Sequence, residues 1–224
     1  MSEINGGALP HVMQVAYLVA ATLFILGLKK LSSPKTARGG NMLGALGMLI
    51  AILATLLDRQ ILSFEWIILG IIVGSAIGAI MAYTVKMTAM PQMVGIFNGF
   101  GGGASLVVAL EEFLRTSVQP FDVSLTIMLS ILIGGVTFSG SMVAAGKLQE
   151  VITGRAVTYP GQRVFNGLVA AVIVGISAYL IATQSQSIPA MMVLIGLALV
   201  FGVLFTIPIG GADMPVVKIG RAHV

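Results

Sequence analysis

The chain has 224 residues, of which 57% are hydrophobic and only 9% are charged. A soluble globular domain carries roughly 25% charged residues, so the composition excludes a soluble domain or soluble enzyme. It predicts an all-α fold instead, a polytopic transmembrane helix bundle embedded in a lipid bilayer. The formal net charge is +4 and there is no cysteine, which excludes disulfide bonds and thiolate metal sites.

Seven apolar stretches are long enough to cross about 30 Å of hydrocarbon. They cover residues 12–28, 41–57, 66–85, 91–110, 123–146, 164–182 and 189–209. The connections between them are short and polar, and none could separate two folded domains. We therefore expect seven complete spans and a single transmembrane domain over residues 1–217.

The basic residues divide unequally between the two sides of this predicted bundle. Eight follow the first, third and fifth stretches, and two lie on the other side: Lys29, Lys30, Lys35, Arg38, Lys86, Lys147, Arg155 and Arg163 against Arg59 and Arg115. Lys and Arg concentrate in cytoplasmic loops, so the N-terminus is expected outside and the C-terminal end in the cytoplasm. The positive charge is thus explained by membrane orientation, and no nucleic-acid partner is expected.

Asn98 is the most informative polar residue of the spans, which have no Asp, Glu, Lys or Arg near their centres. It lies eight residues into the fourth stretch, about 12 Å along a helix axis and near mid-membrane. Gly101, Gly102 and Ser105 follow three, four and seven residues later and share its face. The amide either bonds a neighbouring helix or orders water in a pathway, because lipid offers it no partner.

The fifth stretch carries a matching polar stripe. Ser130, Gly134, Thr137 and Ser141 recur on one side of the predicted helix, and Ser139 sits off that stripe. Hydroxyl groups at this spacing can line a thread of water, or they can bond carbonyls of their own helix. Both interpretations remain open for these residues.

Other patterns predict no chemistry. The small-residue stripe of Gly70, Gly74 and Gly78 indicates helix packing. Gly99-Phe100-Gly101 begins a dinucleotide-like pattern, but no strand precedes it, so nucleotide binding is not expected. We expect no catalytic residue, no metal site and no bound cofactor within this chain.

Several segments together resemble the membrane domain of the beta subunit of proton-translocating nicotinamide nucleotide transhydrogenases. They lie at residues 87–94, 97–103, 135–141, 146–148 and 210–217, the last reading Gly-Gly-Ala-Asp-Met-Pro-Val-Val. The resemblance implies an oxidoreductase complex of the bacterial inner membrane that reduces NADP⁺ with NADH while protons cross the membrane. It also implies an alpha subunit as partner, a dimer of alpha–beta units, and NAD and NADP bound by domains absent from this chain.

The resemblance also assigns roles to residues. In several family members a His taken to lie on the proton path stands where this chain has Asn98, which cannot titrate and would order water instead. Ser105, Thr137, Ser139 and Ser141 join it as candidates for the pathway. Asp213 matches a cytoplasm-facing acid, which makes it a candidate for coupling to the nucleotide domain.

The C-terminal end departs from the family pattern, which implies nine membrane helices. Residues 218–224 are polar and basic where an apolar helix should continue. We therefore expect a membrane domain that is incomplete at its C-terminus, with residues 218–224 forming a non-native tail. Two alternatives remain: a secondary transporter, suggested by the repeated Met-Pro pairs at residues 90–91 and 214–215, or a structural membrane subunit.

Overall fold

A computed structural model of the protein describes residues 8–57, 64–115 and 120–211. Seven α-helices follow in chain order, with a short 3₁₀-helix (Met87–Ala89) before the fourth: α1 (Ala8–Leu31), α2 (Ala37–Leu56), α3 (Phe64–Thr84), α4 (Met90–Arg115), α5 (Phe121–Leu148), α6 (Gln162–Thr183) and α7 (Ile188–Thr206). All seven are long and apolar enough to span a membrane. The described ranges contain no strand. The predicted all-α bundle with seven spans is therefore confirmed.

The helix ends differ from the ends of the apolar stretches for two reasons. α4 runs on to Arg115, five residues beyond its apolar stretch, because Glu111 and Glu112 change its polarity without breaking a helix. α7 stops at Thr206, three residues before its apolar stretch ends. Ile207 still has helical backbone (φ −62°, ψ −30°), but Pro208 follows it and has no N–H to continue the helical hydrogen bonds. Hydropathy thus located the spans, while backbone chemistry set where the helices stop.

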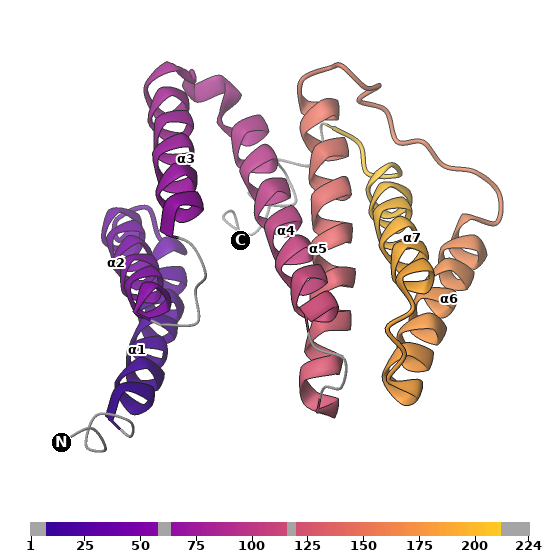
Figure 1. Ribbon diagram of the computed structural model, residues 1–224. Helices are drawn as coiled ribbons and strands as arrows, with labels where there is room; N and C mark the ends of the chain where they lie inside the picture. The colour runs from indigo at the N-terminus through magenta and orange to yellow at the C-terminus, as the bar shows by residue number, and fades with distance from the viewer. Residues whose placement is uncertain (1–7, 58–63, 116–119, 212–224) are drawn as a thin grey trace. The chain divides into compact units, whose positions relative to one another are not determined.

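Residues 1–80 and 81–224 form two compact units. In the first unit, α1 and α2 lie side by side (Figure 1) and approach closely through small residues. A Cβ built at Gly40 would lie 2.8 Å from the carbonyl oxygen of Gly27, and one at Gly47 would lie 3.0 Å from that of Ala20. The hydroxyls of Tyr17 and Thr55 are hydrogen-bonded at 2.8 Å. Small residues therefore set the contact distance between these helices.

The glycine stripe of α3 is not packed within the described chain. No atom of the described residues lies within 4 Å of a Cβ built at Gly70, Gly74 or Gly78, and α3 has no buried residue among those described. The helix packing indicated by this stripe therefore stays a prediction. The spacing marks a face that can be approached closely, but it does not specify an approaching partner.

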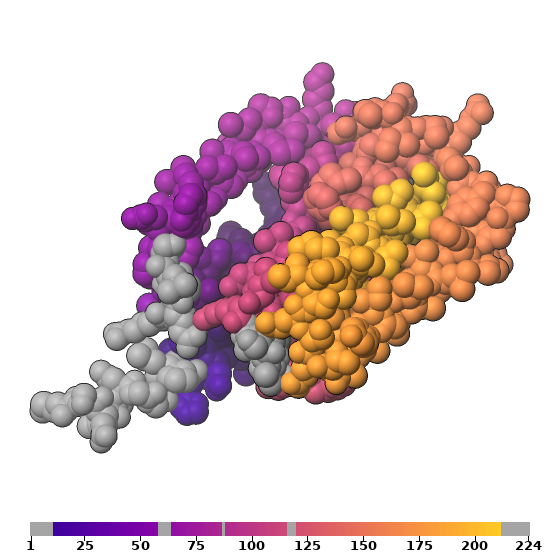
Figure 2. Space-filling model, turned by 45° about the vertical axis from the view of Figure 1, so that its right-hand side comes forward, coloured from indigo at the N-terminus to yellow at the C-terminus, as the bar shows by residue number. Residues whose placement is uncertain are grey.

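In the second unit, α4 packs along α5, and α7 lies between α5 and α6 (Figure 1). Figure 2 shows α6 and α7, in orange to yellow, forming one continuous surface. The centre of this unit is apolar: Ile131 of α5, Ile173 of α6, and Met191 and Leu194 of α7 are at most 1% exposed. This core holds α5 from one side and leaves another side of it to α4.

Candidate functional site between α4 and α5

Two glycines bring the backbones of α4 and α5 into direct contact. A Cβ at Gly102 would lie 2.8 Å from the carbonyl oxygen of Gly134, and a Cβ at Gly134 would lie 2.6 Å from that of Gly102. Real Cβ atoms essentially never approach this closely, so the packing requires glycine on both helices. The side chains that flank this contact are consequently held at close range.

Asn98 of α4 reaches α5 one turn from that contact. Its Nδ2 donates a hydrogen bond to Oγ of Ser141 at 2.8 Å. The residue between the two contacts also favours close approach, since a Cβ at Gly99 would lie 3.3 Å from Cβ of Ser141. The amide of Asn98 therefore has a fixed orientation, set by a hydroxyl on the facing helix.

A cavity of about 470 Å³ opens beside this hydrogen bond. Its polar lining comes from Asn98 and Ser105 of α4 and from Ser130 and Thr137 of α5. Gly101 also lines it, and a Cβ at Gly101 would meet no atom within 4 Å. The two consecutive glycines thus have different structural roles. Gly102 allows the close approach of the α5 backbone, and Gly101 leaves space beside Asn98.

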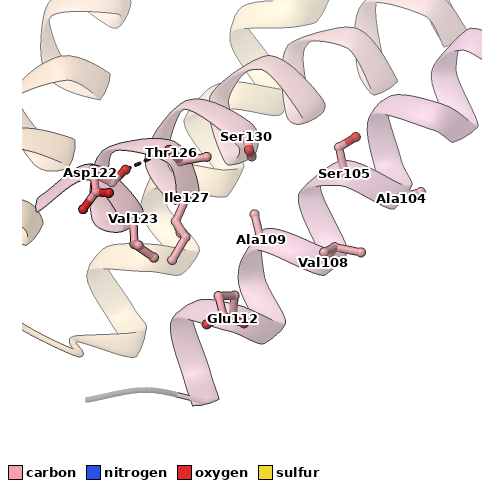
Figure 3. A pocket seen from close by; sticks show the side chains of 10 residues that line it. All are labelled: Ala104, Ser105, Val108, Ala109, Glu112, Asp122, Val123, Thr126, Ile127 and Ser130. Atoms are coloured by element: carbon pink, nitrogen blue, oxygen red, sulfur yellow. Dashed lines mark hydrogen bonds between the residues drawn. The ribbon is translucent and has the colours of Figure 1, made fainter. Parts of the chain in front are cut away.

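A second cavity, of about 590 Å³, shares Ser105 and Ser130 with the first. Figure 3 shows these two side chains on facing helices, with Glu112 and Asp122 farther along the same cavity. Thr126, also in its lining, donates to the carbonyl oxygen of Asp122 at 2.8 Å. Polar groups therefore line the α4–α5 interface from the amide of Asn98 to two carboxyl groups.

The predicted site residues do not all share this interface. Asn98, Ser105 and Thr137 line one cavity, and Ser141 is bonded to Asn98. Ser139 instead donates to the carbonyl oxygen of Gly135 in its own helix at 3.0 Å and contacts Gly202 of α7. Asp213 lies outside the described residues. The structure thus brings together four of the six predicted residues and places Ser139 on the α7 side of α5.

Comparison with known proteins decides the family. The family model described as NAD(P) transhydrogenase beta subunit matches residues 13–219. The chain belongs to this family. Two curated relatives named NAD(P) transhydrogenase subunit beta, one from Rhodospirillum rubrum and one from a strain of the same species, are each 42% identical over 210 residues. The aligned region covers 90% of this chain and 45% of each relative.

The glycine-rich segment of this transhydrogenase beta chain differs in backbone conformation from a dinucleotide-binding turn. Gly99 to Gly103 lie within α4 and are helical throughout. A dinucleotide site needs glycines in the turn between a strand and a helix, where backbone N–H groups are free to hold a pyrophosphate. In a helix interior those groups are bonded to the preceding turn, so these residues do not fit NAD or NADP.

Lys147 is the residue of this family member that sequence reasoning missed. From the sequence it is one of eight basic residues that indicate the orientation, and it lies in segment 146–148 of the family resemblance, but no role of its own follows from either. The structure places it in the last turn of α5 with 2% of its surface exposed. The available signal was its position, a lysine directly after the close-packing residues Ala144, Ala145 and Gly146.

Proposed function

We propose that this chain forms the proton pathway of a proton-translocating NAD(P) transhydrogenase, with hydride transfer from NADH to NADP⁺ coupled to proton movement through it. The polar α4–α5 interface is the observation that carries the proposal. It lies between two long apolar helices. Polar groups are costly in a lipid environment, so polar side chains within such helices indicate a function. The pathway residues are Asn98, Ser105, Thr137 and Ser141.

In this proposal Asn98 orders water and does not itself carry a proton. An amide has no accessible protonation equilibrium, whereas water held between an amide and hydroxyl groups can pass protons along hydrogen bonds. The hydrogen bond to Ser141 fixes the direction of the amide, and the cavity beside Gly101 gives water a place. Ser139 contributes to the packing of α5 on α7 and is left out of the pathway.

The remaining parts of the proposal follow from the family. The chain works in the bacterial cytoplasmic membrane with its N-terminus outside, beside an alpha subunit, in a dimer of alpha–beta units. NAD and NADP bind to domains outside this chain, and Asp213 couples the pathway to the NADP domain. The name of the relatives supports an alpha partner, because a beta subunit is one part of a larger assembly.

The test uses the full-length beta subunit with its alpha partner, reconstituted in liposomes that contain a pH-sensitive dye. Transfer of hydride from NADH to NADP⁺ should change the internal pH, and a protonophore should abolish that change. The protonophore should also accelerate turnover, because it removes the proton gradient that opposes further proton movement. Liposomes with the Asn98→Leu protein should lose both the pH change and the coupled turnover. Direct hydride exchange between bound nucleotides, which bypasses the membrane, should persist.

Two other results would point to other functions. Normal hydride transfer with no pH change in the native protein would make this chain a structural membrane subunit. Nucleotide-independent uptake of a small solute, abolished by Asn98→Leu, would indicate a secondary transporter with its site at the same cavity. Either result would contradict the proposed proton pathway.

A further inference from the structure

A buried lysine joins three segments at one end of the second unit. Lys147, in the last turn of α5, is the only charged side chain classed as buried among the described residues. Removing an ammonium group from water is costly unless hydrogen bonds replace its hydration. The partners of Lys147 therefore show what the protein gains from keeping a charge there.

All three partners of this ammonium group are backbone carbonyl oxygens. Nζ donates to Arg155 at 3.1 Å, to Ile207 at 2.5 Å and to Ile209 at 2.9 Å. An ammonium group has three N–H donors, so each donor has one acceptor. The charge is satisfied without any side chain, and its acceptors come from two segments that are far apart in the sequence.

One of those segments is the end of α7. Ile207 is the C-cap of this helix, where carbonyl groups lack intrahelical partners and carry the negative end of the helix dipole. A cation bonded at this point stabilises the helix terminus and fixes the chain as it leaves α7. Pro208 follows immediately, so the backbone cannot continue as a helix past this point.

The other segment is the connection between α5 and α6. Two backbone hydrogen bonds tie it to the chain after α7, from Val157 N to Ile207 O at 3.2 Å and from Gly211 N to Gly154 O at 2.7 Å. With the Lys147 bonds they form a clasp, defined here as Lys147, residues 154–157 and residues 207–211. On the α4 side, Gln92 donates from Nε2 to the carbonyl oxygen of Leu148 at 3.0 Å. The ends of α4, α5 and α7 are thus tied together by polar contacts.

We propose that Lys147 is a positioning residue for coupling: by holding the clasp closed, it fixes the direction in which the chain leaves α7 relative to the pathway helix α5. This proposal rests on the proposed function, since coupling presupposes a proton pathway and a nucleotide domain. Its geometric basis is the three-carbonyl site. α5 carries the pathway residues Thr137 and Ser141, and its last turn holds the chain that follows α7.

The test compares two lysine substitutions in the full-length beta subunit, assembled with its alpha partner. Lys147→Met keeps most of the apolar stem and removes the donors. Lys86→Met removes the same charge from an exposed lysine before α4 and serves as the matched control. Lys147→Met should lower proton-coupled turnover about tenfold or more, as expected for losing a hydrogen bond to a charged group, and Lys86→Met should not. Hydride exchange between bound nucleotides should remain normal in both variants.

A second measurement examines the clasp directly. The chain has no cysteine, so a single Val157→Cys substitution gives one labelling site on the clasp. Its labelling rate in detergent should rise several-fold when Lys147→Met is added, and it should not change with Lys86→Met. Unchanged labelling would overturn the proposal, as would a folded Lys147→Met protein with normal coupled turnover. If the native protein transfers hydride without moving protons, the proposed function fails, and the labelling result still decides whether Lys147 holds the clasp.

Discussion

The side chains of Asn98 and Ser141 join α4 to α5 through a hydrogen bond of 2.8 Å from the amide nitrogen to the hydroxyl oxygen. A serine hydroxyl that accepts this bond still has its own proton to donate. The contact therefore fixes the relative position of the two helices and leaves a donor directed elsewhere. One pair of residues can in this way serve both packing and an ordered chain of water.

A double-mutant cycle separates these two contributions. In the full-length protein, Asn98→Leu and Ser141→Ala should each lower stability, with a coupling free energy of about 0.6 kcal/mol, as found for hydrogen bonds between membrane helices. Unfolding of the purified proteins in mixed micelles measures this quantity. Both single variants should also lose coupled turnover per folded molecule. A Leu variant that folds and pumps normally would remove Asn98 from the pathway.

Introducing an imidazole tests whether position 98 is reached by protons. The Asn98→His protein should keep some coupled turnover, because imidazole can also bond the hydroxyl of Ser141. Its turnover should acquire a dependence on pH between roughly 5 and 8, where histidine changes its charge. The measurement is coupled turnover against pH for both proteins. Identical pH profiles would show that position 98 lies away from moving protons.

The close approach of α4 and α5 makes a sharp prediction about two adjacent glycines. A Cβ at Gly102 would lie 2.7 Å from Cβ of Thr137 and 2.8 Å from the carbonyl oxygen of Gly134, so Gly102→Ala should cost about 1–3 kcal/mol through overpacking. Gly101→Ala is the matched control, because a Cβ there meets nothing within 4 Å. It should leave stability unchanged or raise it, since alanine favours helix by up to about 1 kcal/mol. Thermal unfolding of both variants checks the order, and equal losses would contradict the packing described here.

The proposed orientation can be read from labelling, because the chain contains no cysteine. Single cysteines at Pro34, between α1 and α2, and at Ser185, between α6 and α7, should lie on opposite sides of the membrane. A membrane-impermeant maleimide added to intact cells should label position 185 and leave position 34 protected until the membrane is permeabilised. The reverse pattern would place the N-terminus in the cytoplasm.

The membrane helices were predictable because their cause is local. Each span needs a continuous apolar stretch, and that stretch is visible in the sequence without knowledge of its neighbours. The helix ends were less predictable. α4 continues through Glu111 and Glu112, because acidic residues end an apolar stretch but are compatible with helical backbone. The missing N–H of Pro208 explains the early end of α7, and that signal is present in the sequence among apolar residues that otherwise continue the span.

The candidate site was predictable only where helix periodicity determines it. The faces of Asn98 and Ser105 on α4, and of Thr137 and Ser141 on α5, follow from spacing alone, and the structure brings these faces together. Ser139 shows the limit, because nothing in the spacing reveals that α7 covers its side of α5. Lys147 shows the same limit, since the acceptors of its ammonium group are backbone atoms from residues 155, 207 and 209.

The reciprocal contact of Gly102 and Gly134 limits how the two helices can move. At this contact each backbone carbonyl lies against the other glycine, and no side chain stands between the two backbones to be repacked. We expect α4 and α5 to move as one rigid body. Access of the pathway to the two membrane faces should then not alternate by separation of these helices. Any gate along this interface must then be small, a rotation of a hydroxyl or amide or a shift of a few waters, and it can be fast for that reason.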